Sequence, residues 1–472
     1  MTEIPENNAT AFDYDIIVMG SGPSGQKAAV QAAKLRKRVA LVEYERDLGG
    51  VCTNTGTIPS KSFRQAVLHL TGFRERSIYG SAYRVKTRIT MEDLTFRISN
   101  IVAHENQVIE DQLRRNGIEI LRGKAEFIDP HTIGVQESDG TVHKKSANYV
   151  VIAVGTIPHH PDSFSVDGEK ILDSDQVLAL KEIPRSITVV GGGIIGLEYA
   201  SWFAVLGVRV TLIEARPELL SFVDFEIIEA LKYHLRDLGM TLRLGEEVER
   251  ISRRSDDQVE TFLKSGKKVV SDVVLVSAGR QGNVATIGLD KTGIVADKYG
   301  RISINEHFQT STPNIYAVGD VIGFPSLAST GMHQGRLATS HAFGINDIDK
   351  HVDLPFGIWT IPEIGLVGET ERSLTEKSVP YEVGISRYKE IARGLLVGDD
   401  TGMLKIIFHR DTHELLGIHI IGDGAIEILH LGQAVLNLKG GLEFFTSGVF
   451  NYPTLTECYK VAALDGLNKI RQ

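Results

Sequence analysis

The sequence has little cysteine and no long apolar segment. Cys52 and Cys458 are the only cysteines among 472 residues, which excludes the disulfide framework of small secreted domains. No apolar run reaches the roughly 18 residues that a membrane-spanning helix needs. Residues 1–13 carry three acidic groups and lack the apolar stretch of a signal peptide. We therefore expect a cytoplasmic protein with no membrane contact.

The sequence also lacks clusters of basic residues and cysteines spaced as metal ligands. The chain has 51 basic and 60 acidic residues, a net charge of −9, and no long basic run that would neutralise nucleic-acid phosphates. The cysteines form no CxxC set, so we expect no metal site. At roughly 150 residues per domain, the length favours about three domains.

Glycine is abundant, and it recurs in a pattern that predicts nucleotide binding. An apolar run over 14–19 leads into Gly20-Ser21-Gly22-Pro23-Ser24-Gly25, then a helical stretch over 26–38 and a strand that ends in Glu43. In such a unit the glycines allow a tight turn, approach to a pyrophosphate and close helix packing. The helix N-terminus then faces the phosphates, and the acid can bind ribose hydroxyls.

The same pattern occurs a second time. Residues 187–190 precede Gly191-Gly192-Gly193-Ile194-Ile195-Gly196, and the strand over 208–214 ends in Glu214. Each acid lies 23 residues after the first glycine of its motif. One G-x-G-x-x-G is a weak signal, but two copies with strand, helix and acid in register are strong. They predict two bound dinucleotides, most simply a flavin and a nicotinamide.

Glu214 and Arg216 bear on the choice of nicotinamide. A carboxylate at this position favours the free 2′-hydroxyl of NAD(H), whereas a nearby arginine can bind the 2′-phosphate of NADP(H). Arg216 follows Glu214 by two residues. It is either a solvated turn charge or part of a site that accepts both nucleotides, with a change of rotamer between them.

Residues 48–67, LGGVCTNTGTIPSKSFRQAV, resemble the redox segment of flavoprotein disulfide reductases, which belong to the pyridine nucleotide-disulfide oxidoreductase family. In those enzymes two cysteines with four residues between them form a disulfide beside the flavin. Cys52 matches the first of them, but Thr57 occupies the second position. Cys52 is then either a packing neighbour of the flavin or a reactive thiol.

Further segments of that family follow in order, at 149–158, 274–283, 312–320 and 358–368. The resemblance therefore covers about residues 14–470. Besides the glycine motifs and their acids, it implies cofactor contacts at Gly50, Val51, Cys52, Thr57, Lys61, Ala125, Gly155, Glu198, Gly279, Arg280, Gly319, Asp320 and Ala328.

The departures from the family pattern indicate the type of enzyme. Tyr452 stands where the disulfide reductases have a histidine before Pro-Thr, and a tyrosine with a pKa near about 10 is a poor base at neutral pH. With Thr57, this disfavours dithiol substrates. The two segments resemble the soluble pyridine nucleotide transhydrogenases. That likeness implies a Si-specific flavoenzyme that uses FAD to move hydride reversibly between NADPH and NAD.

Two other functions remain open. A flavin NAD(P)H dehydrogenase, or diaphorase, would pass electrons to a quinone or oxygen with the same motifs. A non-catalytic sensor of nucleotide ratio would need the binding motifs alone. The resemblance further implies that Lys61 and Glu198 are catalytic, pairing beside the flavin so that a cation stabilises the reduced form. The alternative is a structural ion pair.

The expected fold class is α/β, with two Rossmann-like dinucleotide-binding domains and a C-terminal α+β interface domain. The FAD-binding domain is expected at 1–155 and 281–350, the NAD(P)-binding domain at 156–280, and the interface domain at 351–472. The resemblance implies a homodimer or larger homo-oligomer, with Tyr452-Pro453-Thr454 near the partner's flavin. Residues 91–115 are expected to form one long helix.

Overall fold

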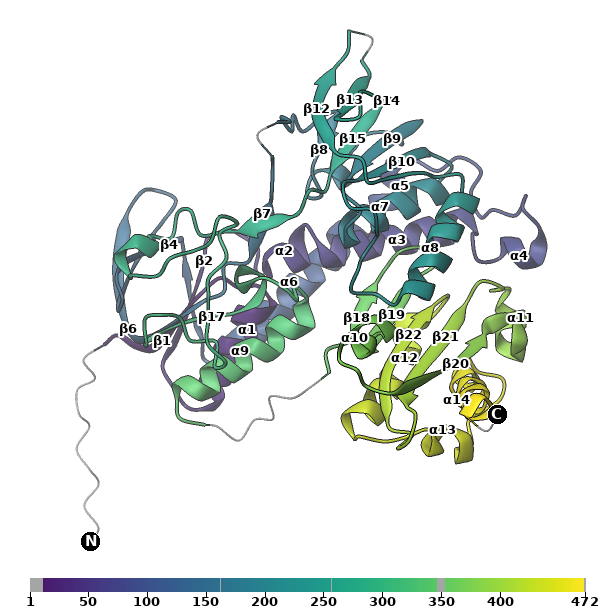
Figure 1. Cartoon of the computed structure of the whole chain (residues 1–472). Coiled ribbons are helices and arrows are strands. Elements are labelled where there is room, and N and C mark those ends of the chain that lie inside the picture. Colours follow the sequence, from purple (N-terminus) through teal and green to yellow (C-terminus); the bar gives the residue numbers. More distant parts are fainter. Residues whose placement is uncertain (1–11, 162, 256, 346–352, 471–472) are drawn as a thin grey trace. The chain divides into compact units, whose positions relative to one another are not determined.

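The computed structural model describes residues 12–161, 163–255, 257–345 and 353–470 (Figure 1). Contacts divide the chain into two compact units. The first comprises Met1–Ser60, Arg97–Pro158 and Arg280–Lys350, and the second comprises Lys61–Phe96, His159–Gly279 and His351–Gln472. The domain boundary expected between residues 350 and 351 lies outside the described residues.

A mostly parallel sheet forms the centre of the first unit. Its parallel strands, in spatial order, are β3 (Glu119–Arg122), β2 (Val39–Glu43), β1 (Tyr14–Met19), β6 (Val142–Ile152) and β17 (Ile315–Ala317). The antiparallel strands β5 (Thr132–Gln136) and β4 (Lys124–Asp129) extend it from β6.

Side chains of β1 alternate between two hydrophobic cores on the two faces of this sheet. Ile16 and Val18 belong to a core built with the helices α1 (Pro23–Lys34), α6 (Ile98–Arg115) and α9 (Ala328–Ala342). Ile17 and Met19 belong to a second core that includes residues of β4 and β5. Both faces are therefore covered, as expected for a parallel sheet. The short elements of this unit are α2 (Gly50–Asn54), β7 (Thr156–Pro158), β16 (Arg280–Gly282), η2 (Leu289–Lys291) and η3 (Gly319–Ile322).

The second unit contains a smaller parallel sheet. Its strands, in spatial order, are β11 (Thr241–Leu244), β10 (Arg209–Glu214), β9 (Ser186–Val190), β15 (Val273–Val276) and β8 (Ile171–Leu172). The helix α7 (Ile194–Val205) is almost entirely buried, while α8 (Phe225–Asp237) buries one apolar stripe. This unit also includes most of α3 (Thr57–Thr71), with α4 (Arg76–Tyr79) and η1 (Val177–Ala179).

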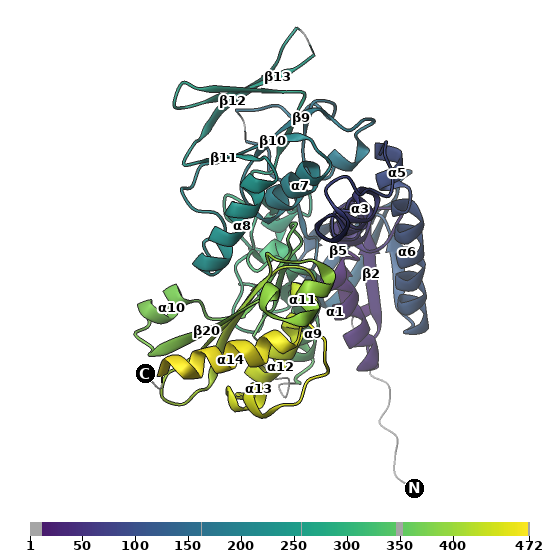
Figure 2. The same ribbon diagram turned by 90° about the vertical axis from the view of Figure 1, so that its right-hand side faces the viewer.

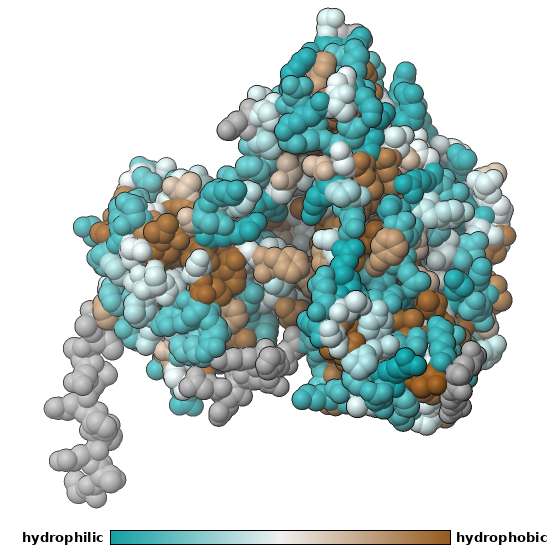
Figure 3. Space-filling view, in the orientation of Figure 1, coloured by the Kyte–Doolittle hydropathy of each residue, from teal (hydrophilic) through white to brown (hydrophobic). Residues whose placement is uncertain are grey.

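A three-stranded antiparallel sheet extends from this part of the chain. It consists of β12 (Val248–Arg253), β13 (Val259–Leu263) and β14 (Lys268–Ser271). Its exposed side chains are mostly hydrophilic, as Figure 3 shows at the top of the view. The ion pair Lys268–Glu260 links β14 to β13, and Arg254, which follows β12, also pairs with Glu260.

The C-terminal part is an α+β layer, as expected. Its antiparallel sheet has the order β18 (Phe356–Ile358), β19 (Ile364–Gly368), β22 (Leu415–Ile421), β21 (Met403–His409) and β20 (Tyr381–Arg387). Its helices are α10 (Glu371–Glu376), η4 (Tyr388–Glu390), α11 (Ala392–Val397), α12 (Ala425–Asn437), α13 (Glu443–Ser447) and α14 (Glu457–Ile470). Figure 2 shows α12 and α14 beside this sheet, and both contribute to one hydrophobic core with it. The predicted fold class is confirmed.

The expectation of one helix over 91–115 is wrong. The segment forms α5 (Met91–Thr95) and α6, interrupted at Phe96 and Arg97. Met91 and Leu94 are buried in the second unit, whereas Ile109 and Leu113 join the α1 core of the first. Of the helices in the described parts of the chain, none is long and apolar enough to cross a membrane.

Candidate active site

The first glycine motif connects β1 to α1, and close packing explains two of its glycines. A Cβ on Gly20 would overlap the carbonyl oxygen of Ala153, and one on Gly25 would overlap the carbonyl oxygen of Gly20. At Gly22, by contrast, a Cβ would have no atom from elsewhere in the described chain within 4 Å. Gly20 and Gly25 therefore allow the helix to approach the strand, and Gly22 leaves the turn open to a ligand.

The N-terminus of α1 is suited to an anion. Among the described residues, no side chain caps it, and Pro23 occupies its first turn. The first backbone N–H groups of a helix have no acceptor within the helix, and together with the helix dipole they bind phosphate. Glu43 lies beside the turn, where its Oε2 accepts hydrogen bonds from Ser21 N at 2.9 Å and Ser21 Oγ at 2.6 Å.

Other predicted flavin contacts converge on this turn. A Cβ on Gly50 would lie 3.1 Å from Gly22 Cα, so α2, which carries Val51 and Cys52, begins against the glycine motif. Ser24 Oγ lies where a Cβ on Gly319 or Gly331 would be. The first unit thus brings α2, η3 and α9 to the motif that the sequence identified.

Asp320 and Arg280 also lie close together. Arg280 donates from Nε to Thr156 Oγ1 at 2.9 Å and from a terminal nitrogen to Thr156 O at 2.8 Å. Burial raises the pKa of Asp320, although the charge of Arg280 and a hydrogen bond with Thr156 act against the shift. A carboxylate here can accept hydrogen bonds from ligand hydroxyl groups.

The remaining predicted residues of the first unit lie in several elements. Thr57 begins α3, and its carbonyl accepts a hydrogen bond from Ser60 Oγ at 3.1 Å. Ala328 begins α9. Ala125 lies in β4 and packs against a hydrophobic core. Gly155 accepts a backbone hydrogen bond from Asn283 at 3.1 Å.

The second glycine motif repeats the geometry of the first. A Cβ on Gly191 would overlap the Ser277 carbonyl oxygen, and one on Gly196 would overlap the Gly191 carbonyl oxygen. Gly193 caps α7 and, like Gly22, faces no other atom of the described chain within 4 Å of a Cβ. Ile195 lies in the first turn of α7. Gly279 accepts a backbone hydrogen bond from His159 at 3.0 Å.

Glu214 is held by the second motif and by Arg216. Its Oε2 accepts a hydrogen bond from Gly192 N at 2.6 Å, and its Oε1 accepts from Arg216 N at 2.9 Å and Arg216 Nε at 3.0 Å. Burial alone would raise the pKa of Glu214, but the hydrogen bonds from Arg216 and Gly192 outweigh it and lower the pKa. The Arg216 side chain is 58% exposed and that of Glu214 only 7%, so the guanidinium faces solvent.

Lys61 and Glu198 form an ion pair within the second unit. Lys61 Nζ lies 2.6 Å from Glu198 Oε2, and the other carboxylate oxygen accepts a hydrogen bond from Trp359 N at 2.8 Å. The Glu198 side chain is 4% exposed and that of Lys61 23%. The ammonium also lies 5.7 Å from the centre of the Trp202 ring. This arrangement fixes one partly accessible positive charge.

A second ion pair, which the sequence did not predict, lies beside the first. A terminal nitrogen of Arg64 lies 2.8 Å from Glu363 Oε2, and both side chains are buried. Arg64 follows Lys61 by three residues in α3, and that helical spacing could have suggested that the two share a face. No local signal identifies Glu363, which is 299 residues away in sequence.

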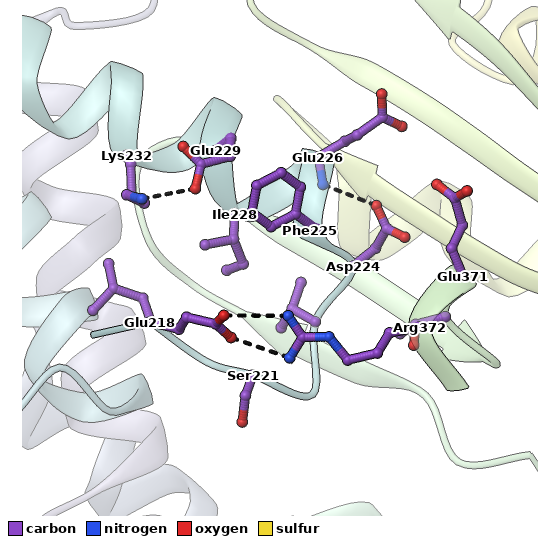
Figure 4. Close-up of a pocket in the computed structure, with 13 residues that line it drawn as sticks. Glu218, Ser221, Asp224, Phe225, Glu226, Ile228, Glu229, Lys232, Glu371 and Arg372 are labelled. Atoms are coloured by element: carbon purple, nitrogen blue, oxygen red, sulfur yellow. Dashed lines mark hydrogen bonds and ion pairs between the residues drawn. The ribbon is translucent and has the colours of Figure 1, made fainter. Parts of the chain in front are cut away.

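Three clustered carboxylates, those of Asp224, Glu226 and Glu371, are bound by the buried Lys405. They lie beside a pocket with a cavity volume of about 80 Å³. Figure 4 shows the Glu218–Arg372 ion pair across this pocket. Its lining has five acidic and two basic residues, a balance of charge that disfavours phosphate groups.

Comparisons with known proteins agree with this geometry. The family model described as pyridine nucleotide-disulphide oxidoreductase matches residues 14–335, and the dimerisation domain of the same family matches residues 354–463. The solved structure of LpdA from Mycobacterium tuberculosis superimposes with a TM-score of 0.88 at 25% identity, covering 95% of this chain and 98% of its own. The HOCl-induced flavoprotein disulfide reductase RclA from Escherichia coli gives a TM-score of 0.85 at 25% identity, covering 96% and 99%.

Curated relatives are more similar in sequence. A soluble pyridine nucleotide transhydrogenase of Mycobacterium bovis (strain BCG / Pasteur 1173P2) is 51% identical over 463 residues, which cover 97% of this chain and 98% of the relative. One of Colwellia psychrerythraea is 44% identical over 464 residues, covering 98% and 99%. With two glycine motifs, their paired acids and these matches over nearly its full length, the chain belongs to the pyridine nucleotide-disulphide oxidoreductase family.

Proposed function

We propose that the protein is an FAD-dependent transhydrogenase that moves hydride reversibly between NADPH and NAD. The observation that carries this proposal is that both nucleotide motifs are intact while the redox dithiol is missing. Neither Cys52 nor Cys458 is in a disulfide bond. Cys458 belongs to the core of the C-terminal sheet, where burial raises its pKa to about 11. Cys458 is therefore unsuited to replace the second redox cysteine, whose position Thr57 occupies.

The first unit supplies the residues that would hold FAD. The uncapped N-terminus of α1 would bind the pyrophosphate, Glu43 the ribose, and Asp320 the ribityl hydroxyls. Bound FAD supplies the chemistry, since a flavin can accept a hydride from one nicotinamide and return it to another. The chain contributes binding, orientation and the placement of charge.

The second unit supplies the residues that would hold the nicotinamide dinucleotides. The N-terminus of α7 would bind their pyrophosphate, as in the first unit. Glu214 would accept hydrogen bonds from the ribose of NAD(H), and the exposed guanidinium of Arg216 would turn to the 2′-phosphate of NADP(H). A transhydrogenase needs both nucleotides at one site in turn, and this adjacent pair supports that requirement.

Lys61 and Glu198 are the residues that we assign to catalysis. Glu198 is anchored by Trp359 N and holds the Lys61 ammonium in place. A fixed cation stabilises negative charge that develops during a reaction, because no reorganisation is needed at that moment. The pair would therefore favour reduction of the bound flavin.

Under this proposal, residues 1–155 with 281–350 bind FAD, 156–280 bind the nicotinamide, and 351–472 mediate dimer formation. Tyr452 is 68% exposed and Val449 97% exposed, which supports a partner subunit against this stretch. Tyr452-Pro453-Thr454 would then lie near the partner's flavin. We also propose a cytoplasmic location, where both nucleotides are available; cell fractionation tests it.

Anaerobic turnover of the purified protein tests the activity. NADPH is supplied with thio-NAD, whose reduction is followed at its own wavelength, and deuterium at one C4 position of NADPH tests the Si-specific transfer. We expect one thio-NAD reduced for each NADPH oxidised. Reduction of a quinone or oxygen without reduction of thio-NAD would instead identify a diaphorase. A protein that binds nucleotides without turnover would indicate a sensor.

A further inference from the structure

We infer that Arg64 and Glu363 are positioning residues for the Lys61–Glu198 pair. The inference rests on the proposed function, because it assigns these two residues to the same flavin chemistry. They act through a short backbone segment, residues 359–363, which they hold against the helix that carries Glu198.

Arg64 fixes this segment at three points. Its terminal nitrogen donates to Glu363 Oε2 at 2.8 Å and to Thr360 O at 3.2 Å. Its guanidinium lies 5.3 Å from the centre of the Trp359 ring. The side chains of Arg64 and Glu363 are only 5% and 4% exposed, so solvent competes little for these contacts.

The same segment fixes Glu198 and the helix α7 around it. Trp359 N donates to Glu198 Oε1 at 2.8 Å, and Trp359 O accepts from Trp202 Nε1 at 2.8 Å. Ile361 N donates to Ser201 Oγ at 3.1 Å. The segment therefore lies between α3, which carries Lys61 and Arg64, and α7, which carries Glu198.

The energetics favour a positioning role over a purely stabilising one. Burial lowers the pKa of Arg64 and raises that of Glu363, so each charge is held in place against a desolvation cost. Replacing such a buried pair by apolar residues is often neutral for stability. The pair does, however, hold the planar guanidinium of Arg64 in one orientation. Because that guanidinium lies against the Trp359 ring, it also fixes the position of Trp359.

Charges around the pair come from several elements. Arg74 follows α3 and pairs with Asp423, and both influence the pKa of Glu363. Glu198 on α7 in turn raises the pKa of Arg64 by its charge. The Lys61–Glu198 pair therefore lies next to the Arg64–Glu363 pair in one connected network.

The test compares Glu363→Gln and the double variant R64M/E363M with wild type as FAD-loaded proteins. Melting temperature reports stability, redox titration reports the midpoint potential of the flavin, and stopped-flow gives the NADPH dissociation constant and the flavin reduction rate. The matched control is Glu371→Gln. It removes a carboxylate that pairs with Lys405, a different buried cation of the same unit.

If the pair positions Lys61 and Glu198, both variants shift the flavin reduction equilibrium about 10-fold towards the oxidised form, which corresponds to about −30 mV. We expect flavin reduction about 10-fold slower, with the NADPH dissociation constant within about twofold of wild type. The double variant should have a higher melting temperature than Glu363→Gln, but its flavin midpoint potential should remain as low. Glu371→Gln should keep the wild-type midpoint potential.

A flavin reduction equilibrium constant and a flavin reduction rate that both stay within about twofold of wild type in both variants would overturn the inference. Arg64–Glu363 would then be a structural pair. Equal losses in Glu371→Gln would overturn it too, because they would indicate general destabilisation. If wild type reduces its flavin but fails to reduce thio-NAD, the proposed function fails while the comparison of potentials still decides the positioning role.

Discussion

At the residue scale, Lys61 is the first position to change. Lys61→Met removes the ammonium that lies 2.6 Å from Glu198 Oε2. We expect flavin reduction by NADPH to slow by about 10²-fold, as when one preorganised stabilising group is lost from an active site. Stopped-flow absorbance of the flavin measures this rate.

The control for that prediction is Lys291→Met, which removes a lysine from an exposed ion pair with Glu126. Exposed pairs contribute about 0–1 kcal/mol, so this variant should reduce its flavin at the wild-type rate. Unchanged reduction in Lys61→Met would mean that Lys61–Glu198 is only a structural ion pair.

Arg216 should control the choice between the two nicotinamides. Arg216→Ala removes the exposed guanidinium and leaves Glu214 bound to Gly192. A hydrogen bond to a charged group contributes about 1.5–3 kcal/mol, so NADPH affinity should fall about 10- to 100-fold while NADH affinity changes little. Calorimetric titration of each nucleotide measures both constants.

Arg372→Ala is the matched control, because Arg372 forms an exposed ion pair with Glu218 in the same unit. It should leave both affinities unchanged. Equal weakening of NADPH and NADH in Arg216→Ala would contradict a 2′-phosphate contact and favour a solvated turn charge.

At the scale of elements, the glycine motifs meet two separate requirements: close packing of the helix against the strand, and a turn that is open to a ligand. Gly25→Ala would push α1 away from β1, because its Cβ overlaps the Gly20 carbonyl oxygen. We expect a loss of about 1–3 kcal/mol in the free energy of unfolding of the apoprotein, as for other overpacked sites, and a loss of bound FAD. Denaturant unfolding and flavin absorbance measure the two effects.

Gly22→Ala separates these requirements. Its φ of −62° suits alanine, and its Cβ meets no other atom of the described chain within 4 Å. The apoprotein should keep its stability while FAD affinity falls, because the methyl group occupies the approach to the pyrophosphate. Wild-type FAD affinity in Gly22→Ala would argue against a ligand at this turn.

Lys405 links β21 to the start of α8 through Asp224 and Glu226. Burial alone would lower the pKa of Lys405, but its hydrogen bonds with carboxylates raise it above its usual value. Its stabilising contribution is therefore complete below the unfolded pKa and is lost only as pH rises through the higher folded pKa. Lys405→Met should cost about 3–5 kcal/mol, because it leaves buried Asp224 unpaired.

Chemical denaturation at pH 6, 7, 8 and 9 checks this prediction. The difference between wild type and Lys405→Met should be constant across that range, because Lys405 stays protonated throughout. A difference that shrinks towards pH 9 would contradict the raised pKa. Lys232→Met, which removes a lysine paired with Glu229, should cost much less.

At the scale of the whole molecule, the dimer proposal predicts a charge-sensitive surface. Val449 is 97% exposed and lies near Phe444 and Tyr452 in sequence, both of which are also exposed. Val449→Asp should weaken self-association, because it would bury a charge against a partner. Light scattering measures the mass. Val295→Asp, at an exposed valine of the first unit, should leave the mass unchanged.

The sequence predicted the local units of this fold well. In both glycine motifs the strand, turn, helix and acid follow each other within about 30 residues, and short-range sterics determine them. The α+β character of the C-terminal part was also expected and is confirmed. The break at Phe96 and Arg97 was missed because helical periodicity continues through it, and burial in different units separates its two halves.

The sequence by itself therefore determined the two nucleotide motifs, the lack of a redox dithiol and the presence of Lys61, because each depends on residue type and local spacing. Only the tertiary structure decided that Glu363 meets Arg64, that Trp359 N meets Glu198 and that Lys405 meets three carboxylates. These contacts join residues from about 30 to 300 positions apart. A buried charge needs a partner of opposite charge, but which residue becomes that partner depends on which side chains folding brings close together.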